Sequence, residues 1–116
     1  MKFKMIVAFV DDHKTAKVLD AARAAGATGA TVINNARGEG VSRKKTFFGL
    51  SLESQADVLL FVVESHRAKS ILNTISKVAA FDEEEGSGIA VLLDVEEAVG
   101  VAHQIQALTH KVDIDT

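Results

Sequence analysis

The chain has 116 residues, the length of a single domain, and its apolar content is that of a globular protein. It contains no cysteine, which excludes disulfides and cysteine-ligated zinc, and its net charge of −3 gives no general basic footprint for nucleic acid. The N-terminal residues carry no signal-peptide cleavage site, and the apolar run behind them is too short to cross a membrane. We therefore expect a cytoplasmic protein that binds no nucleic acid and does not insert directly into a membrane.

The first third of the chain predicts a strand, a helix and a second strand. Residues 3–10 are almost continuously apolar, which indicates a central strand or one that is buried on both faces. Residues 30–33 are β-compatible and predict the second strand. Between them, residues 13–25 predict a helix, with the two preceding aspartates as candidate caps and Gly26 as its left-handed end. The apolar residues of this helix form one stripe: Val18, Leu19, Ala22 and Ala25.

A long segment without periodicity follows the second strand. Residues 36–52 show neither the helical nor the strand repeat, and a loop of this length inside a small domain is usually functional or disordered. Its cations and its Phe47-Phe48 pair suit a contact with a partner protein that becomes ordered on binding. We expect the partner-binding residues to be Arg43, Lys44, Lys45, Phe47 and Phe48.

The next two elements have the clearest patterns. Residues 56–63 predict a well-covered strand, and Ser65 after it is a candidate helix cap. The helix is expected to end near Ala80. Its apolar residues recur at spacings of three and four: Ala68, Ile71, Leu72, Ile75, Val78 and Ala79.

The last third is less regular. Residues 81–88 form an acidic and then glycine-rich loop, and residues 89–93 predict a fourth strand. Residues 94–100 are read as a turn or a one-turn helix, and residues 102–116 as a weakly patterned end.

The order of elements predicts an α+β fold. Strand, helix, strand, long loop, strand, helix, strand is the order of a ferredoxin-like βαββαβ sandwich, with a four-stranded antiparallel sheet and both helices on one face. We expect one domain over residues 1–101, including the long loop 36–52, and a C-terminal extension of that domain over residues 102–116. Because the strands are apolar on both faces, the uncovered sheet face is expected to meet other copies in an oligomer, for which a three-fold ring is a natural closure.

Three short motifs make the chain resemble the PII-type signal-transduction proteins, the P-II nitrogen regulators. Residues 26–32 (GATGATV) resemble the family's entry to its long loop, residues 86–88 (GSG) its second, glycine-rich loop, and residues 94–99 (DVEEAV) its motif after the fourth strand. The resemblance extends over residues 2–101. It implies a homotrimer that regulates an enzyme or a membrane transporter through its long loop.

The resemblance also implies an effector site for an adenine nucleotide, ATP or ADP, in the clefts between subunits. By position, Thr31 and Val32 lie beside the adenine, and Val62 offers backbone contacts. The base of the long loop and the glycine-rich loop supply the rest of the site: Arg37, Gly38, Gly40, Gly86, Ser87 and Gly88. Glycine suits these positions because bare backbone N–H groups can approach phosphate closely.

Several positions depart from the family pattern. Ile89, Glu97 and Gly100 stand where the family has cations, and residues 82–85 place four carboxylates beside the expected phosphates. The tyrosine that the family modifies in its long loop is absent, because the chain has no tyrosine. We therefore read a divergent PII-like protein. In it ATP is expected to bind weakly or not at all, and AMP, ADP or a small anion held by Arg37 is the better candidate.

A second hypothesis places a metal- or small-anion-binding protein, or an enzyme, on the same trimeric fold. Residues 82–85 offer oxygen ligands, and His103 and His110 are seven positions apart. Solvated side chains explain these residues with fewer assumptions, and the sequence has no nucleophile–base pair and no Walker motif. We expect no catalytic residues.

Overall fold

The structure of the protein is a computed structural model that describes residues 2–36, 46–47, 50–51, 56–84 and 87–100. Two α-helices are present, α1 (Thr15–Ala24) and α2 (Ala68–Ala79), each preceded by a single 3-10 turn, Asp12–Lys14 and Ser65–Arg67. The strands are β1 (Phe3–Asp11), β2 (Thr31–Ala36), β3 (Thr46–Phe47), β4 (Leu50–Ser51), β5 (Ala56–Glu64) and β6 (Gly88–Asp94).

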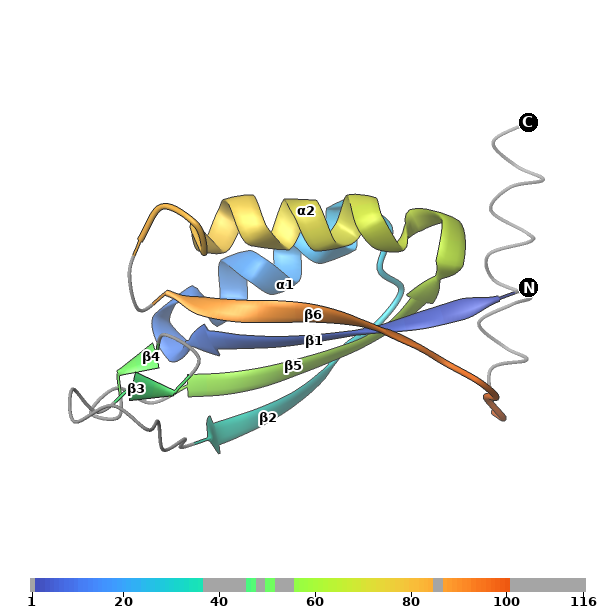
Figure 1. The fold of residues 1–116 in the computed structure, drawn as a ribbon, viewed down its shortest axis with the longest axis horizontal. Helices are drawn as coiled ribbons and strands as arrows, with labels where there is room; N and C mark the ends of the chain where they lie inside the picture. The colour runs from blue at the N-terminus through green and yellow to red at the C-terminus, as the bar shows by residue number, and fades with distance from the viewer. Residues whose placement is uncertain (1, 37–45, 48–49, 52–55, 85–86, 101–116) are drawn as a thin grey trace.

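The main sheet has the ferredoxin-like topology that the order of elements predicts. Its strand order is β2-β5-β1-β6, and every neighbouring pair is antiparallel. Both helices lie on one face of this sheet, and no helix or strand of the described ranges covers the other face (Figure 1). The predicted fold class is confirmed.

The helical periodicities are confirmed by burial. In α2, Ala68, Ile71, Ile75 and Ala79 are fully buried, while Leu72 and Val78 pack against the same core. In α1, Val18 and Ala22 are fully buried. Both helices rest on alternate residues of the two central strands: Ile6, Ala8 and Val10 of β1, with Leu59, Phe61 and Val63 of β5.

The predicted helix caps are wrong. Asp11 and Asp12 make no side-chain cap hydrogen bond, and neither does Ser65, whose backbone N–H bonds the carbonyl of Lys2. Each α-helix is instead entered through its 3-10 turn, whose i→i+3 bonds satisfy the first free N–H groups. A side-chain cap is therefore not needed at either helix.

The long loop contains more strand than its pattern predicts. β2 continues through Asn34 and Asn35 to Ala36, with a register shift after Ile33. Asn35 has a φ of 63°, a left-handed conformation that asparagine tolerates better than most residues. Farther on, β3 and β4 pair antiparallel within a stretch that we expected to be irregular.

The sheet face away from the helices is apolar. Antiparallel register aligns its side chains in rows across the strands, one being Leu60–Val7–Val91 and the next Val58–Phe9–Ile89. The side chains of these two rows are half-buried or exposed, and Ile33 and Leu93 near the edges of the face are 49% and 46% exposed. Within the described part of one chain, the face is apolar and uncovered, as predicted.

Beyond β6, residues 95–100 contain bends at Glu96 and Gly100 and no helix, so of the two alternatives expected there, a turn or a one-turn helix, the helix is absent. No helix in the described ranges is long and apolar enough to cross a membrane.

Candidate functional site

The segment between α2 and β6 folds back onto the end of the helix. We call its described residues, 80–84 and 87–88, the glycine turn. Ala80 adopts a left-handed conformation that ends α2, and the N–H of Glu84 then donates to the Ala80 carbonyl at 2.9 Å. The hydroxyl of Ser87 lies 2.9 Å from the Ala80 carbonyl and 2.8 Å from that of Glu84. Because Ser87 is 3% exposed, its side chain holds the turn and does not face solvent.

Gly88 begins β6 in a conformation that only glycine adopts readily. Its φ is 123°, and an added Cβ would lie 2.0 Å from the Phe9 carbonyl oxygen and 2.9 Å from the Phe81 ring. A side chain here would therefore push β6 away from β1. The turn depends on this glycine for close packing as well as for its backbone angle.

Lys14 anchors the glycine turn from the start of α1. Its Nζ donates to the Ala79 carbonyl at 2.8 Å and to Glu84 Oε2 at 2.8 Å, and the residue is only 6% exposed. The hydrogen bond from Lys14, and then its positive charge, lower the pKa of the Glu84 carboxyl. One of the four carboxylates expected to repel an anion is thus already paired within the chain.

Sequence reasoning missed Lys14, although the pattern contained a signal for it. Lys14 stands four positions before Val18 and eight before Ala22, so it continues the buried stripe of α1. A lysine on an apolar stripe is rarely buried without a partner. That position alone predicts an acceptor nearby.

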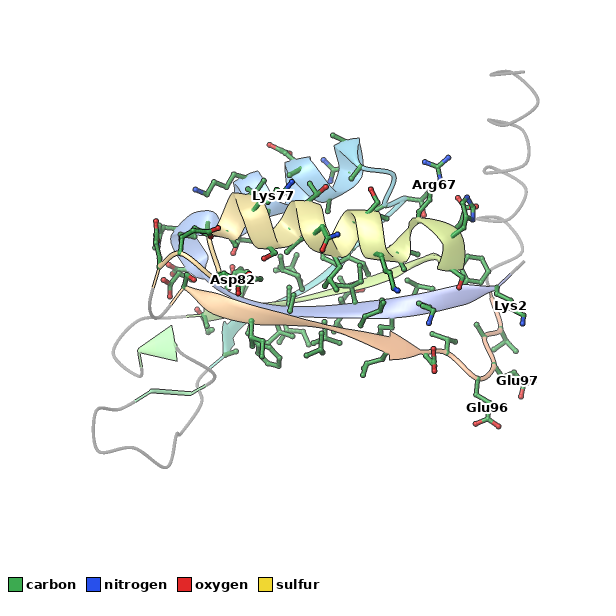
Figure 2. The ribbon with its side chains drawn as sticks, turned by 45° about the horizontal axis from the view of Figure 1, so that its top comes forward. Lys2, Arg67, Lys77, Asp82, Glu96 and Glu97 are labelled. Atoms are coloured by element: carbon green, nitrogen blue, oxygen red, sulfur yellow. The ribbon has the colours of Figure 1, made fainter. Side chains whose placement is uncertain are left out.

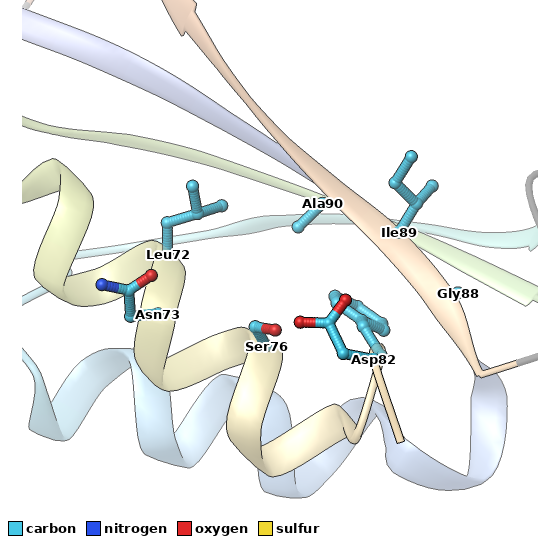
Figure 3. A pocket seen from close by; sticks show the side chains of 8 residues that line it. Leu72, Asn73, Ser76, Asp82, Gly88, Ile89 and Ala90 are labelled. Atoms are coloured by element: carbon cyan, nitrogen blue, oxygen red, sulfur yellow. The ribbon is translucent and has the colours of Figure 1, made fainter. Parts of the chain in front are cut away.

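A groove of about 380 Å³ runs along the helix side of β6 beside the glycine turn (Figure 3). The side chains of Ser76 and Asp82 point toward each other between α2 and β6, and Ala90 lies on the strand beside them. Because the Asp82 carboxylate is part of the lining, the groove is a poor place for a phosphate. Its lining comes from α2, the glycine turn and β6: Leu72, Asn73, Ser76, Phe81, Asp82, Gly88, Ile89 and Ala90.

The predicted adenine contacts lie on different faces of the sheet. Thr31 is exposed on the open face, opposite Leu60, whereas the side chain of Val32 packs against the core on the helix side. Val62 lies on the open face opposite Met5. Because neighbouring strand residues point to opposite faces, Val32 can reach a ligand on the open face only through its backbone.

The predicted phosphate contacts are separated from these residues by the width of the sheet. Gly88 is on β6 at one edge, opposite Val10, while Thr31 is on β2 at the other edge. The positions of the missing cations are also far apart, since Ile89 is the second residue of β6 and Glu97 follows the other end of that strand (Figure 2). The part of β6 between Ile89 and Asp94 alone is about 17 Å long. One chain therefore does not bring the predicted site together.

The remaining predicted site residues lie outside the described ranges: Arg37, Gly38, Gly40, Arg43, Lys44, Lys45, Phe48 and Gly86. Phe47 is described only as a residue of β3 that pairs with Leu50. His103 and His110 are also outside these ranges. Among the residues that the structure does describe, no three acidic or histidine side chains form a group that could hold a metal ion.

The sequence model of one family, described as nitrogen regulatory protein P-II, matches residues 3–104. The chain belongs to the P-II family. The match includes both helices and all strands of the main sheet, and it confirms the resemblance read from the three motifs.

A solved P-II structure has the same fold. CPII from Thiomonas intermedia K12, described as bound to ADP, AMP and acetate, matches with a TM-score of 0.65 and 17% sequence identity. The match covers 87% of this chain and 96% of that chain. A search of curated proteins gives no match.

Proposed function

We propose that this P-II protein is a homotrimeric regulator that binds an adenine nucleotide between its subunits. Residues 36–52 then contact a target protein, an enzyme or a membrane transporter, and change its activity. Its role is regulation and not catalysis. The observation that supports this proposal most directly is the separation of the expected effector contacts. Thr31 and Gly88 lie on the two edge strands of one sheet, so they come together only when two copies of the chain meet.

The open sheet face supports assembly into a closed ring. It presents rows of apolar side chains across β5, β1 and β6, one of which continues to Ile33 on β2, and no element of the described ranges lies over them. Soluble monomers seldom expose a continuous apolar patch of this kind. When two different edges of the same sheet meet, the interface is heterologous, and such an interface gives a ring where the rotation between copies closes. A trimer is the ring that the family resemblance implies.

An unpaired carboxylate oxygen near the loop base supports the same arrangement. Oδ1 of Asp11 is buried and has no hydrogen-bond partner among the described residues, and Asp11 pairs in register with Ala56, where β5 begins. Buried acceptors in folded proteins nearly always find a donor. A second subunit or a ligand hydroxyl would supply one here.

The charges near the glycine turn favour a nucleotide with few phosphates. Lys14 pairs with Glu84, but Asp82 and Glu83 remain exposed, and Ile89 offers no charge-assisted hydrogen bond. Each further phosphate adds repulsion without adding a described cationic partner. AMP or ADP is therefore proposed as the effector in preference to ATP, and the P-II neighbour bound to ADP and AMP supports this choice.

Isothermal titration calorimetry with AMP, ADP and ATP tests this function. We expect AMP or ADP to bind, with ATP no tighter than either. An Ile89→Lys variant should raise the affinity for ADP more than that for AMP, because the new cation stands beside the phosphates, while Ile89→Met should leave both unchanged. Submicromolar ATP binding by the wild type, or no binding of any of the three nucleotides, would contradict the proposal.

A further inference from the structure

Lys14 connects three segments that are far apart in the sequence. It stands at the start of α1, and its Nζ bonds the last turn of α2 through the Ala79 carbonyl and the glycine turn through Glu84. Both contacts are 2.8 Å long. No predicted effector contact includes this residue.

A role in core stability alone does not account for a lysine at this position. Its side chain continues the buried stripe of Val18 and Ala22, where an apolar residue of similar length would pack without losing hydration. Unlike an apolar side chain, the lysine forms an ion pair with Glu84. The Glu84 side chain is 63% exposed, so this ion pair holds a residue that the core does not cover. The contact therefore fixes the turn relative to the start of α1.

We propose that Lys14 is a positioning residue that holds the glycine turn ready for the effector. This inference rests on the proposed function, in which the turn lies along the phosphates. Lys14 itself does not touch the ligand. It fixes Glu84, and through the Glu84 carbonyl it fixes Ser87 and the start of β6.

The Lys14–Glu84 contact is expected to raise the fraction of molecules in which the glycine turn has the conformation that binds the effector. When a site is formed for only part of the time, the apparent dissociation constant rises by the inverse of that fraction. Without Lys14, the turn keeps its bonds from Ser87 and from the Glu84 N–H but loses its link to α1. Ligand binding must then include the ordering of the turn, which lowers affinity.

The test measures AMP and ADP affinity by calorimetry and amide exchange at residues 80–84 and 87–88. Lys14→Met should weaken both nucleotides about fivefold or more and speed exchange at the Glu84 amide about tenfold. Glu84→Ala, a change at an exposed residue, should have the same two effects without disturbing the core. Lys14→Arg and Glu84→Gln should stay within about twofold of the wild type, because each keeps a hydrogen bond between positions 14 and 84.

A matched control comes from the other ion pair of the same length. Lys4 donates to Asp94 at 2.8 Å at the far end of β6, so Lys4→Met removes an ion pair of the same length, at a more exposed lysine, away from the turn. It should change neither affinity nor exchange at the turn.

Two results would overturn the inference. Glu84→Gln and Glu84→Ala both remove the negative charge of Glu84. If both variants bind nucleotide more tightly than the wild type, and ADP gains more than AMP, then the charge of the pair and not the position of the turn governs affinity. If Lys14→Met leaves exchange at the Glu84 amide unchanged, it does not hold the turn. Should wild-type protein bind neither nucleotide, the proposed function fails, while the exchange measurement still judges the role of Lys14 separately.

Discussion

At the scale of single residues, the glycine turn depends on a few groups whose replacement has defined consequences. Gly88 allows β6 to approach β1, Ser87 bonds the turn to the end of α2, and Lys14 joins both to α1. Each acts inside one chain, so its effect on stability can be measured apart from any ligand.

Gly88→Ala should destabilise the fold by roughly 2–4 kcal/mol, because the residue would have to keep a left-handed φ and its Cβ would meet a backbone oxygen. Gly29→Ala is the matched control, since a Cβ there meets no atom within 4 Å. Urea denaturation of the two variants measures both changes. Similar stabilities for the two would show that Gly88 is not under the constraint described.

The pH dependence of stability should report the Lys14–Glu84 pair. The pKa of the Glu84 carboxyl is lowered in the folded chain by its bond to Lys14, so the folded state binds fewer protons there than the unfolded state. Stability from this pair is complete above the ordinary pKa of a glutamate and is lost as pH falls through the lower, folded value. Melting temperatures between pH 7 and pH 3 should fall more steeply for the wild type than for Glu84→Gln; parallel curves would contradict the pairing.

At the scale of elements, periodicity predicted most of the fold correctly. The spacing of Ile71 and Ile75 placed α2, and the apolar runs placed β1, β5 and β6, because burial against a core imposes these repeats. The short pair β3 and β4 has no such repeat, and β2 extends through two asparagines by one left-handed residue. Helix caps failed for a related reason: the backbone of each 3-10 turn replaces the side chain that a cap rule expects.

Replacing a central residue of α2 tests this reading of the core. Ile71→Ala or Ile75→Ala should each cost about 2–5 kcal/mol, because both side chains are fully buried between helix and sheet. Lys69→Ala, on the exposed side of the same helix, should change stability by less than about 0.5 kcal/mol. A negligible loss at either isoleucine in chemical denaturation would mean that the helix is rotated about its axis.

At the scale of the whole molecule, the family resemblance proposes site residues without showing how they meet. It implies that Thr31, Gly88 and the position of Glu97 are neighbours of one ligand, yet within one chain they lie at different edges and ends of the sheet. The sequence alone does not say which copy contributes which residue. That depends on which strands lie at the edges of the folded sheet, here β2 and β6. An apolar sheet face was predictable from strand composition, and its rows of side chains follow from the register.

A charge at the centre of the open face should dissociate the assembly. Val7→Glu places a carboxylate in the row between Leu60 and Val91, where a partner's apolar surface would strip its water. We expect a folded monomer that has lost AMP and ADP binding, checked by sedimentation and calorimetry. Ala16→Glu, on the exposed surface of α1, adds the same single negative charge as a control and should remain assembled.

The central claim is that copies of this chain assemble through the open sheet face and so complete the effector site. Multi-angle light scattering of the wild type at micromolar concentration tests it most directly. The account predicts a mass three times that of the 12.4 kDa chain, unchanged by dilution across the micromolar range. A stable monomer at that concentration would contradict it, because the effector contacts at the two edges of the sheet would then never meet.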